Sequence, residues 1–64
     1  MKRQAFLQHL ARHGCVLKRE GASHSIFINL GTGKRCAVPR HREIGRLTVA
    51  AICAQLEVPP PAHE

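Results

Sequence analysis

The segment between residues 24 and 39 constrains the fold most, because it predicts two tightly connected strands. His24–Leu30 alternates between two sets of side chains, as a strand with two different faces does. Gly31-Thr32-Gly33 is typical of a hairpin connection, and Lys34–Val38 is the next strand. Pro39 ends it, since proline has no amide hydrogen for a sheet. Strands joined this closely run antiparallel.

The N-terminal part predicts a helix followed by one more strand. Residues 2–13 carry an apolar stripe at helical spacing. Gly14 suits the end of this helix, because glycine adopts positive φ without a Cβ clash. Cys15–Arg19 is a short strand and residues 20–23 are a turn, so three strands form an antiparallel meander.

The C-terminal part predicts a second amphipathic helix. It begins at about Gly45 or Leu47 and ends at Leu56, with apolar residues at helical spacing. Prolines then stop the helix. We therefore expect one domain over residues 1–58 and a proline-rich tail over residues 59–64.

The predicted fold class is α+β, in the order α-β-β-β-α. Two amphipathic helices can cover one face of a three-stranded antiparallel sheet while the other face remains in water. Double-stranded-RNA-binding domains have this layout, which alone establishes no function. A chain of 64 residues buries a small core, so we expect a shallow surface site. Self-association remains an open alternative.

The charge balance favours a polyanionic partner. Ten Lys and Arg against four Asp and Glu give a net charge of +6. Nucleic acid is the first candidate, an acidic protein the second and an anionic membrane the third. No apolar run approaches the roughly 20 residues that span a bilayer, and no signal peptide is apparent. We therefore expect a cytoplasmic protein that does not bind membranes.

The cysteines and paired histidines predict neither a disulfide framework nor a metal site. Cys15, Cys36 and Cys53 are odd in number and widely spaced, which is typical of small core residues. His9 and His13 have a metal-binding spacing on a helix, but no third ligand is evident. An exposed polar helix face explains them better. We expect no metal and no cofactor.

His24 is the main candidate for chemistry, because a neutral imidazole exchanges protons near pH 7. Two interpretations remain open. Its alternation with Ile26 and Ile28 favours a half-buried residue on the core face. Its position at a strand start, after a turn of small residues, favours exposure at the sheet edge.

Metal-free RNA cleavage needs a base, an acid and positive charge around the phosphate. His24 can be the base or the acid. His41 could be a second such group, a phosphate contact or a capping residue, and Glu43 could orient an arginine or cap the second helix. Each cation could equally be a solvated surface charge. The candidate phosphate contacts are Lys18, Arg19, Ser23, Arg35, Arg40, His41 and Arg42.

Two motifs give the chain a family resemblance. Gly21-Ala22-Ser23-His24 precedes a strand, and Val38-Pro39-Arg40-His41-Arg42-Glu43-Ile44 precedes the last helix. With these motifs, the chain from Lys2 to about Val58 resembles HicA, the toxin of HicA–HicB toxin–antitoxin systems. The resemblance implies a double-stranded-RNA-binding-like fold and a ribonuclease that cleaves mRNA and arrests translation. It also implies a catalytic histidine at His24 and inhibition by a HicB antitoxin that covers the active site.

The sequence therefore predicts a metal-independent endoribonuclease toxin. The main alternative is a small RNA-binding module without catalysis, which composition and element order fit equally well. A third possibility is a protein whose only role is to pair with an acidic partner.

Overall fold

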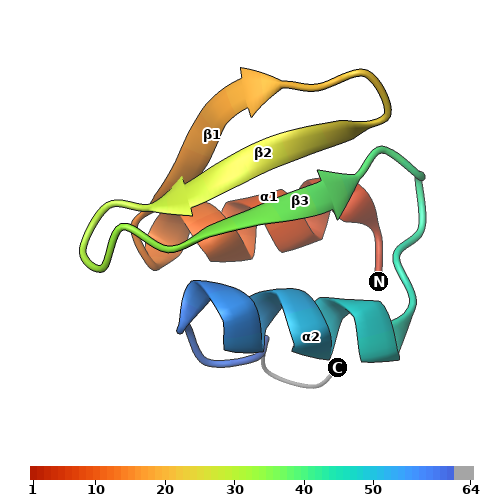
Figure 1. The fold of residues 1–64 in the computed structure, drawn as a ribbon. Coiled ribbons are helices and arrows are strands. Elements are labelled where there is room, and N and C mark those ends of the chain that lie inside the picture. The colour runs from red at the N-terminus through yellow and green to blue at the C-terminus, as the bar shows by residue number, and fades with distance from the viewer. Residues whose placement is uncertain (62–64) are drawn as a thin grey trace.

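The protein, described here by a computed structural model over residues 1–61, follows the predicted element order (Figure 1). The sequence boundaries shift only slightly, with Pro39 included in the last strand rather than placed after it. The elements are α1 Arg3–Arg12, β1 Cys15–Glu20, β2 His24–Asn29, β3 Arg35–Pro39 and α2 Arg46–Leu56.

The three strands form one antiparallel sheet in the order β1-β2-β3. The central strand β2 begins at His24, which lies opposite Pro39 on β3. Pro39 is tolerated because β3 is an edge strand. On the other side of β2, the pairing register shifts between Leu17 and Arg19 of β1, a bulge that re-aims the end of that strand.

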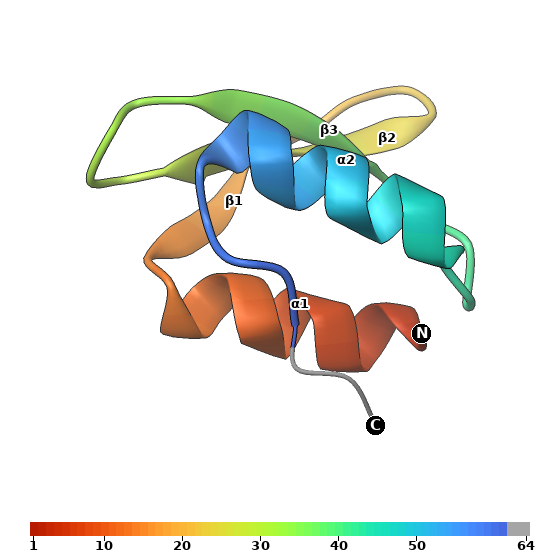
Figure 2. The ribbon, with the colours of Figure 1, turned by 90° about the horizontal axis from the view of Figure 1, so that it is seen from below.

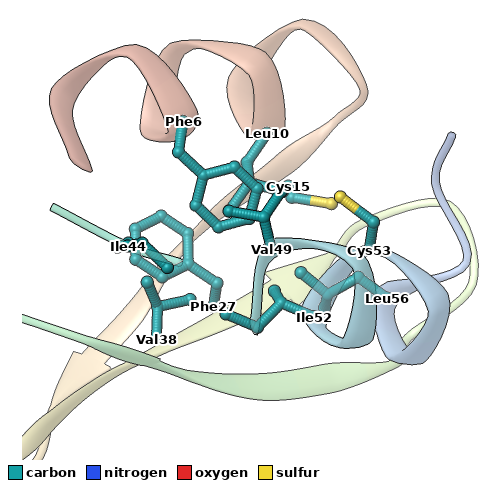
Figure 3. Packing of buried hydrophobic residues seen from close by; sticks show 10 residues of the cluster. All are labelled: Phe6, Leu10, Cys15, Phe27, Val38, Ile44, Val49, Ile52, Cys53 and Leu56. Atoms are coloured by element: carbon teal, nitrogen blue, oxygen red, sulfur yellow. The ribbon is translucent and has the colours of Figure 1, made fainter. Parts of the chain in front are cut away.

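Both helices cover the same face of the sheet, which confirms the predicted architecture (Figure 2). The core lies between this face and the helices, and its side chains come from every element (Figure 3). Helix α1 ends where predicted, since Gly14 has φ +79°. The core residues are Phe6, Leu10, Cys15, Phe27, Val38, Ile44, Val49, Ile52, Cys53 and Leu56.

The isoleucines of β2 do not face the helices, although their hydrophobicity suggests that they would; the alternate set of side chains does. Ser25, Phe27 and Asn29 are buried toward the helices, whereas His24 is exposed. The core-face interpretation of His24 is therefore wrong. Asn29 explains how a polar residue fits the inner face: its side-chain amide donates to the carbonyl of Leu56 and its oxygen accepts from the Gly31 amide.

The N-terminus fixes the loop between β3 and α2. The Met1 ammonium donates to the Ile44 carbonyl at 3.0 Å, and the Ile44 amide donates back to Met1 at 2.8 Å. The amide of Arg3 adds a bond to the carbonyl of Arg42 at 2.8 Å. This short antiparallel contact ties residues 42–44 to the start of α1.

His9 is buried, so its prediction as part of an exposed polar face is wrong. Its ring Nε2 lies 2.7 Å from the carbonyl oxygen of Pro59. Val58 also packs against the core. The start of the predicted tail, residues 59–64, therefore contacts α1, and residues 62–64 lie outside the described part of the chain.

The three cysteines are free, and two of them are core residues as expected. Cys15 and Cys53 are buried and their sulfur atoms point toward one another (Figure 3). Cys36 is partly exposed. Burial raises the pKa of all three thiols, which keeps them protonated near neutral pH.

Candidate nucleic-acid interface

His24 is exposed at one end of the sheet, on the face that the helices leave uncovered. It lines an open groove of about 410 Å³. The groove passes the edge strand β3 and continues between β3 and α2, where Pro39, Leu47, Thr48 and Gln55 are among its lining residues. None of the groove-lining residues is lysine or arginine, so the positive charge lies around this groove rather than within it.

The turn before His24 is built by a close backbone approach. The Gly21 amide donates to the His24 carbonyl at 2.8 Å. A Cβ on Gly21 would lie 2.9 Å from that oxygen, a distance that real Cβ atoms do not reach without a shift. Glycine is therefore required here for space, and the turn can place Ser23 and His24 at the exposed sheet end.

Several predicted RNA contacts gather around His24. Arg19 pairs with Ile26, two residues from His24, and its guanidinium lies beside Gly21. Ser23 is exposed in the turn. His41 and Arg42 are also exposed and follow Pro39, the cross-strand partner of His24. The end of β1, the start of β2 and the end of β3 thus bring these groups to one end of the sheet.

Arg35 and Lys18 occupy different positions. Arg35 pairs with Ile28, four residues along β2 from His24, which corresponds to about 13 Å at the usual rise per residue. If an RNA strand binds with one phosphate at His24, Arg35 can therefore contact only a more distant phosphate of that RNA. Lys18 lies in the bulge of β1 and is exposed, outside the regular pairing.

Arg40 differs from the other cations, because its guanidinium is bound within the protein. One terminal nitrogen donates to the carbonyls of Gly21 and Ala22, both at 2.8 Å. The other donates to the Glu20 carboxylate and, at 3.4 Å, to the Ser25 hydroxyl. Each of the two terminal nitrogens of the Arg40 guanidinium therefore has two acceptors within the protein.

Three residues that the sequence analysis did not select complete this cluster. The fully buried Ser25 hydroxyl donates to Glu20 at 2.7 Å and accepts from Arg3 at 3.0 Å. Arg3 also donates through Nε to the carbonyl of Pro39 at 2.8 Å. The hydrogen bond from Ser25 lowers the pKa of Glu20, and the charges of Arg40 and Arg3 act in the same direction.

Glu43 neither orients an arginine nor caps α2, contrary to both predictions. Its carboxylate lies 3.6 Å from the Met1 ammonium and 3.4 Å from the Lys2 ammonium. Helix α2 begins after Gly45 without a side-chain cap. Glu43 thus takes part in the contact between the N-terminus and the β3–α2 loop.

Neither metal ligands nor a membrane span is found in the described part of the chain. Among residues 1–61, no three His, Cys, Asp or Glu side chains are grouped as metal ligands would be. No helix in the same range is both long enough and apolar enough to span a bilayer.

These features define a small basic protein with a histidine exposed on a three-stranded sheet. The family model of the HicA toxin of bacterial toxin–antitoxin systems matches residues 3–58. The chain therefore belongs to the HicA toxin family, as its two motifs predict. Searches of curated proteins and of solved structures give no match.

Proposed function

We propose that this toxin is an endoribonuclease that cleaves mRNA without a metal ion and thereby arrests translation. The observation that carries the proposal is an exposed histidine, His24, at the sheet end where Arg19, His41 and Arg42 also gather. Membership of the HicA family supports it, since a toxin must act on a cellular target.

His24 would act as the general base or the general acid of transesterification. As the base, its imidazole takes the proton of a ribose 2′-hydroxyl while the 2′-oxygen bonds to the adjacent phosphorus. The bond from phosphorus to the 5′-oxygen then breaks, and that oxygen takes a proton from the acid. The products are a 2′,3′-cyclic phosphate and a 5′-hydroxyl.

The surrounding cations would hold the RNA and stabilise negative charge on the reacting phosphate. Arg19 and Arg42 are the nearest candidates for the scissile phosphate, and Arg35 is placed for a neighbouring phosphate. His41 would contribute a phosphate contact or a second acid/base group. The complete set of proposed RNA contacts other than Arg40 is Lys18, Arg19, Ser23, Arg35, His41 and Arg42.

The inhibitor would be a HicB-type antitoxin that covers His24. The excess of positive charge on the toxin favours an acidic surface on this partner, which would also speed their association. The proposed site of action is the cytoplasm, where mRNA and the antitoxin are both present. No cofactor is required by the proposed chemistry.

One observation favours a second candidate, an RNA-binding module without catalysis. Among residues 1–61, only one histidine lies on the regular part of the exposed sheet face, and a ribonuclease with a single acid/base group is expected to turn over slowly. A pure binder would use phosphate and shape contacts on the same surface. It would lose affinity with lost positive charge and would be insensitive to the removal of His24.

Expression of the wild type and of His24→Ala in a growing bacterial culture tests the proposal. We expect growth arrest and fragmented mRNA with the wild type, and neither with His24→Ala at equal protein level. Co-expression of the cognate antitoxin should restore growth. Growth arrest and mRNA fragmentation that persist in His24→Ala would contradict the proposed role of this residue.

A further inference from the structure

We propose that Arg40 is a positioning residue for His24 rather than a contact to RNA. This inference rests on the proposed ribonuclease function and assigns a different role to one of the predicted phosphate contacts. It follows from where the guanidinium is bound and from which atoms it binds.

The guanidinium of Arg40 is attached mainly to the backbone of the turn that precedes His24. Its two 2.8 Å bonds go to the carbonyl oxygens of Gly21 and Ala22, three and two residues before His24. Carbonyl oxygens that accept bonds from one planar fork have a fixed relative orientation. The turn is therefore held as a unit against the end of β3.

Glu20 and Ser25 hold the fork in place from the other side. Glu20 accepts from Arg40, and Ser25 donates to the same carboxylate at 2.7 Å. Ser25 is fully buried and follows His24 directly, so it is a rigid anchor. The residues on both sides of His24 in the chain are thus bound by the same cluster.

Arg3 fixes the neighbouring strand in the same way. Its Nε donates to the carbonyl of Pro39, the residue opposite His24 in the sheet, and its terminal nitrogen donates to Ser25 at 3.0 Å. Two arginines therefore bind backbone carbonyls before His24 and across from it. His24 itself is exposed, and its side chain forms no hydrogen bond with residues 1–61 that would fix it.

An Arg40 that bound phosphate through its terminal nitrogens would have to give up these bonds. Its terminal nitrogens each have two acceptors within the protein, and its side chain is only 35% exposed. Arg42 offers a matched control, because it is exposed and its side chain forms no hydrogen bond or salt bridge with residues 1–61. It carries the same charge two residues further along the same loop.

The test compares Arg40→Gln and Arg42→Gln, which remove the same charge, with Glu20→Gln, which removes the charged acceptor of one Arg40 nitrogen and keeps every cation. Cleavage of a defined mRNA gives kcat and KM for each variant. RNA affinity against salt concentration is measured in the His24→Ala background, so that no substrate is consumed. Thermal unfolding shows that each variant is folded.

We expect Arg40→Gln and Glu20→Gln to lower kcat at least tenfold with KM within twofold of wild type. Arg42→Gln, in contrast to both, should raise KM, whatever its effect on kcat, and should reduce the slope of log affinity against log salt by about 0.7, the value for one phosphate contact on a single strand. The inference is overturned if Arg40→Gln raises KM and reduces the slope while kcat stays within twofold, or if Glu20→Gln leaves kcat unchanged.

Amide hydrogen exchange separates this inference from the proposed function. If the wild type shows no cleavage that depends on His24, the proposed function fails, and the exchange rate of the Gly21 amide, which donates to the His24 carbonyl, decides the structural role of Arg40. At least tenfold faster exchange in Arg40→Gln than in Arg42→Gln would show that Arg40 holds the turn. Equal exchange in these two variants would overturn that role.

Discussion

Replacing Ser25 by alanine removes the hydroxyl at the centre of the hydrogen-bond cluster beside His24. Ser25 is fully buried, and its oxygen donates to Glu20 at 2.7 Å and accepts from Arg3 at 3.0 Å. Alanine preserves the backbone and leaves Glu20, Arg3 and the more distant Arg40 without this contact. The expected result is a folded but less stable protein.

The magnitude follows from the exposure of the two closest partners, Glu20 and Arg3. Glu20 lies at the surface, so water replaces the lost bond there and we assign it no energy. Arg3 is half-buried, and a hydrogen bond to a charged group contributes about 1.5–3 kcal/mol. We therefore expect a loss of about 2 kcal/mol in the free energy of unfolding. For a domain of this size, that lowers Tm by about 8–16 °C.

Urea and thermal unfolding followed by circular dichroism measure this loss, with Ser23→Ala as the matched control. Ser23 is exposed and forms no side-chain hydrogen bond within the described residues, so its replacement should change stability by less than about 0.5 kcal/mol. A Ser25→Ala protein as stable as Ser23→Ala would refute the reasoning, because the buried cluster would then contribute nothing to stability.

Three further outcomes are expected. The pKa of Glu20 is lowered from 4.5, so the ionised carboxylate stabilises the folded protein above pH 4.5, and this stabilisation is lost as pH falls through the lowered pKa. The free energies of unfolding of wild type and Glu20→Gln, measured against pH, should therefore converge at acidic pH. Gly21→Ala places a Cβ 2.9 Å from the His24 carbonyl; it should lower cleavage severalfold, and unchanged cleavage would contradict the tight turn. Iodoacetamide at pH 7.5 should label the partly exposed Cys36 before the two buried thiols, and mass spectrometry of digests would show any other order.

The architecture is predictable from the sequence because its signals are local. The hairpin at Gly31-Thr32-Gly33, the helical apolar stripes and Gly14 each depend on neighbours within a few residues. The sense of the β2 alternation is different. Of the two alternating sets of β2 side chains, the one with Ile26, Ile28 and His24 is the more hydrophobic. The inner face nevertheless carries Ser25, Phe27 and Asn29, because hydrogen bonds satisfy both polar residues there.

The residues that hold the candidate site could not be predicted, because their partners are distant in sequence. Arg3 binds Ser25 and Pro39 across 22 and 36 residues, and nothing in its local sequence distinguishes it from another surface arginine. The same holds for Arg40, whose acceptors lie 15 to 20 residues earlier. A buried serine in strand alternation with Phe27 is the one local signal that could have indicated a polar cluster.

The measurement that tests the account most directly pairs binding with cleavage. Purified wild type and His24→Ala are each incubated with one end-labelled mRNA in EDTA, and affinity and cleavage are measured on the same samples. We predict equal affinity within about threefold, with cleavage to 2′,3′-cyclic phosphate ends by the wild type alone. Equal binding without cleavage by either protein would favour the RNA-binding module, and cleavage by both would contradict the assignment of His24.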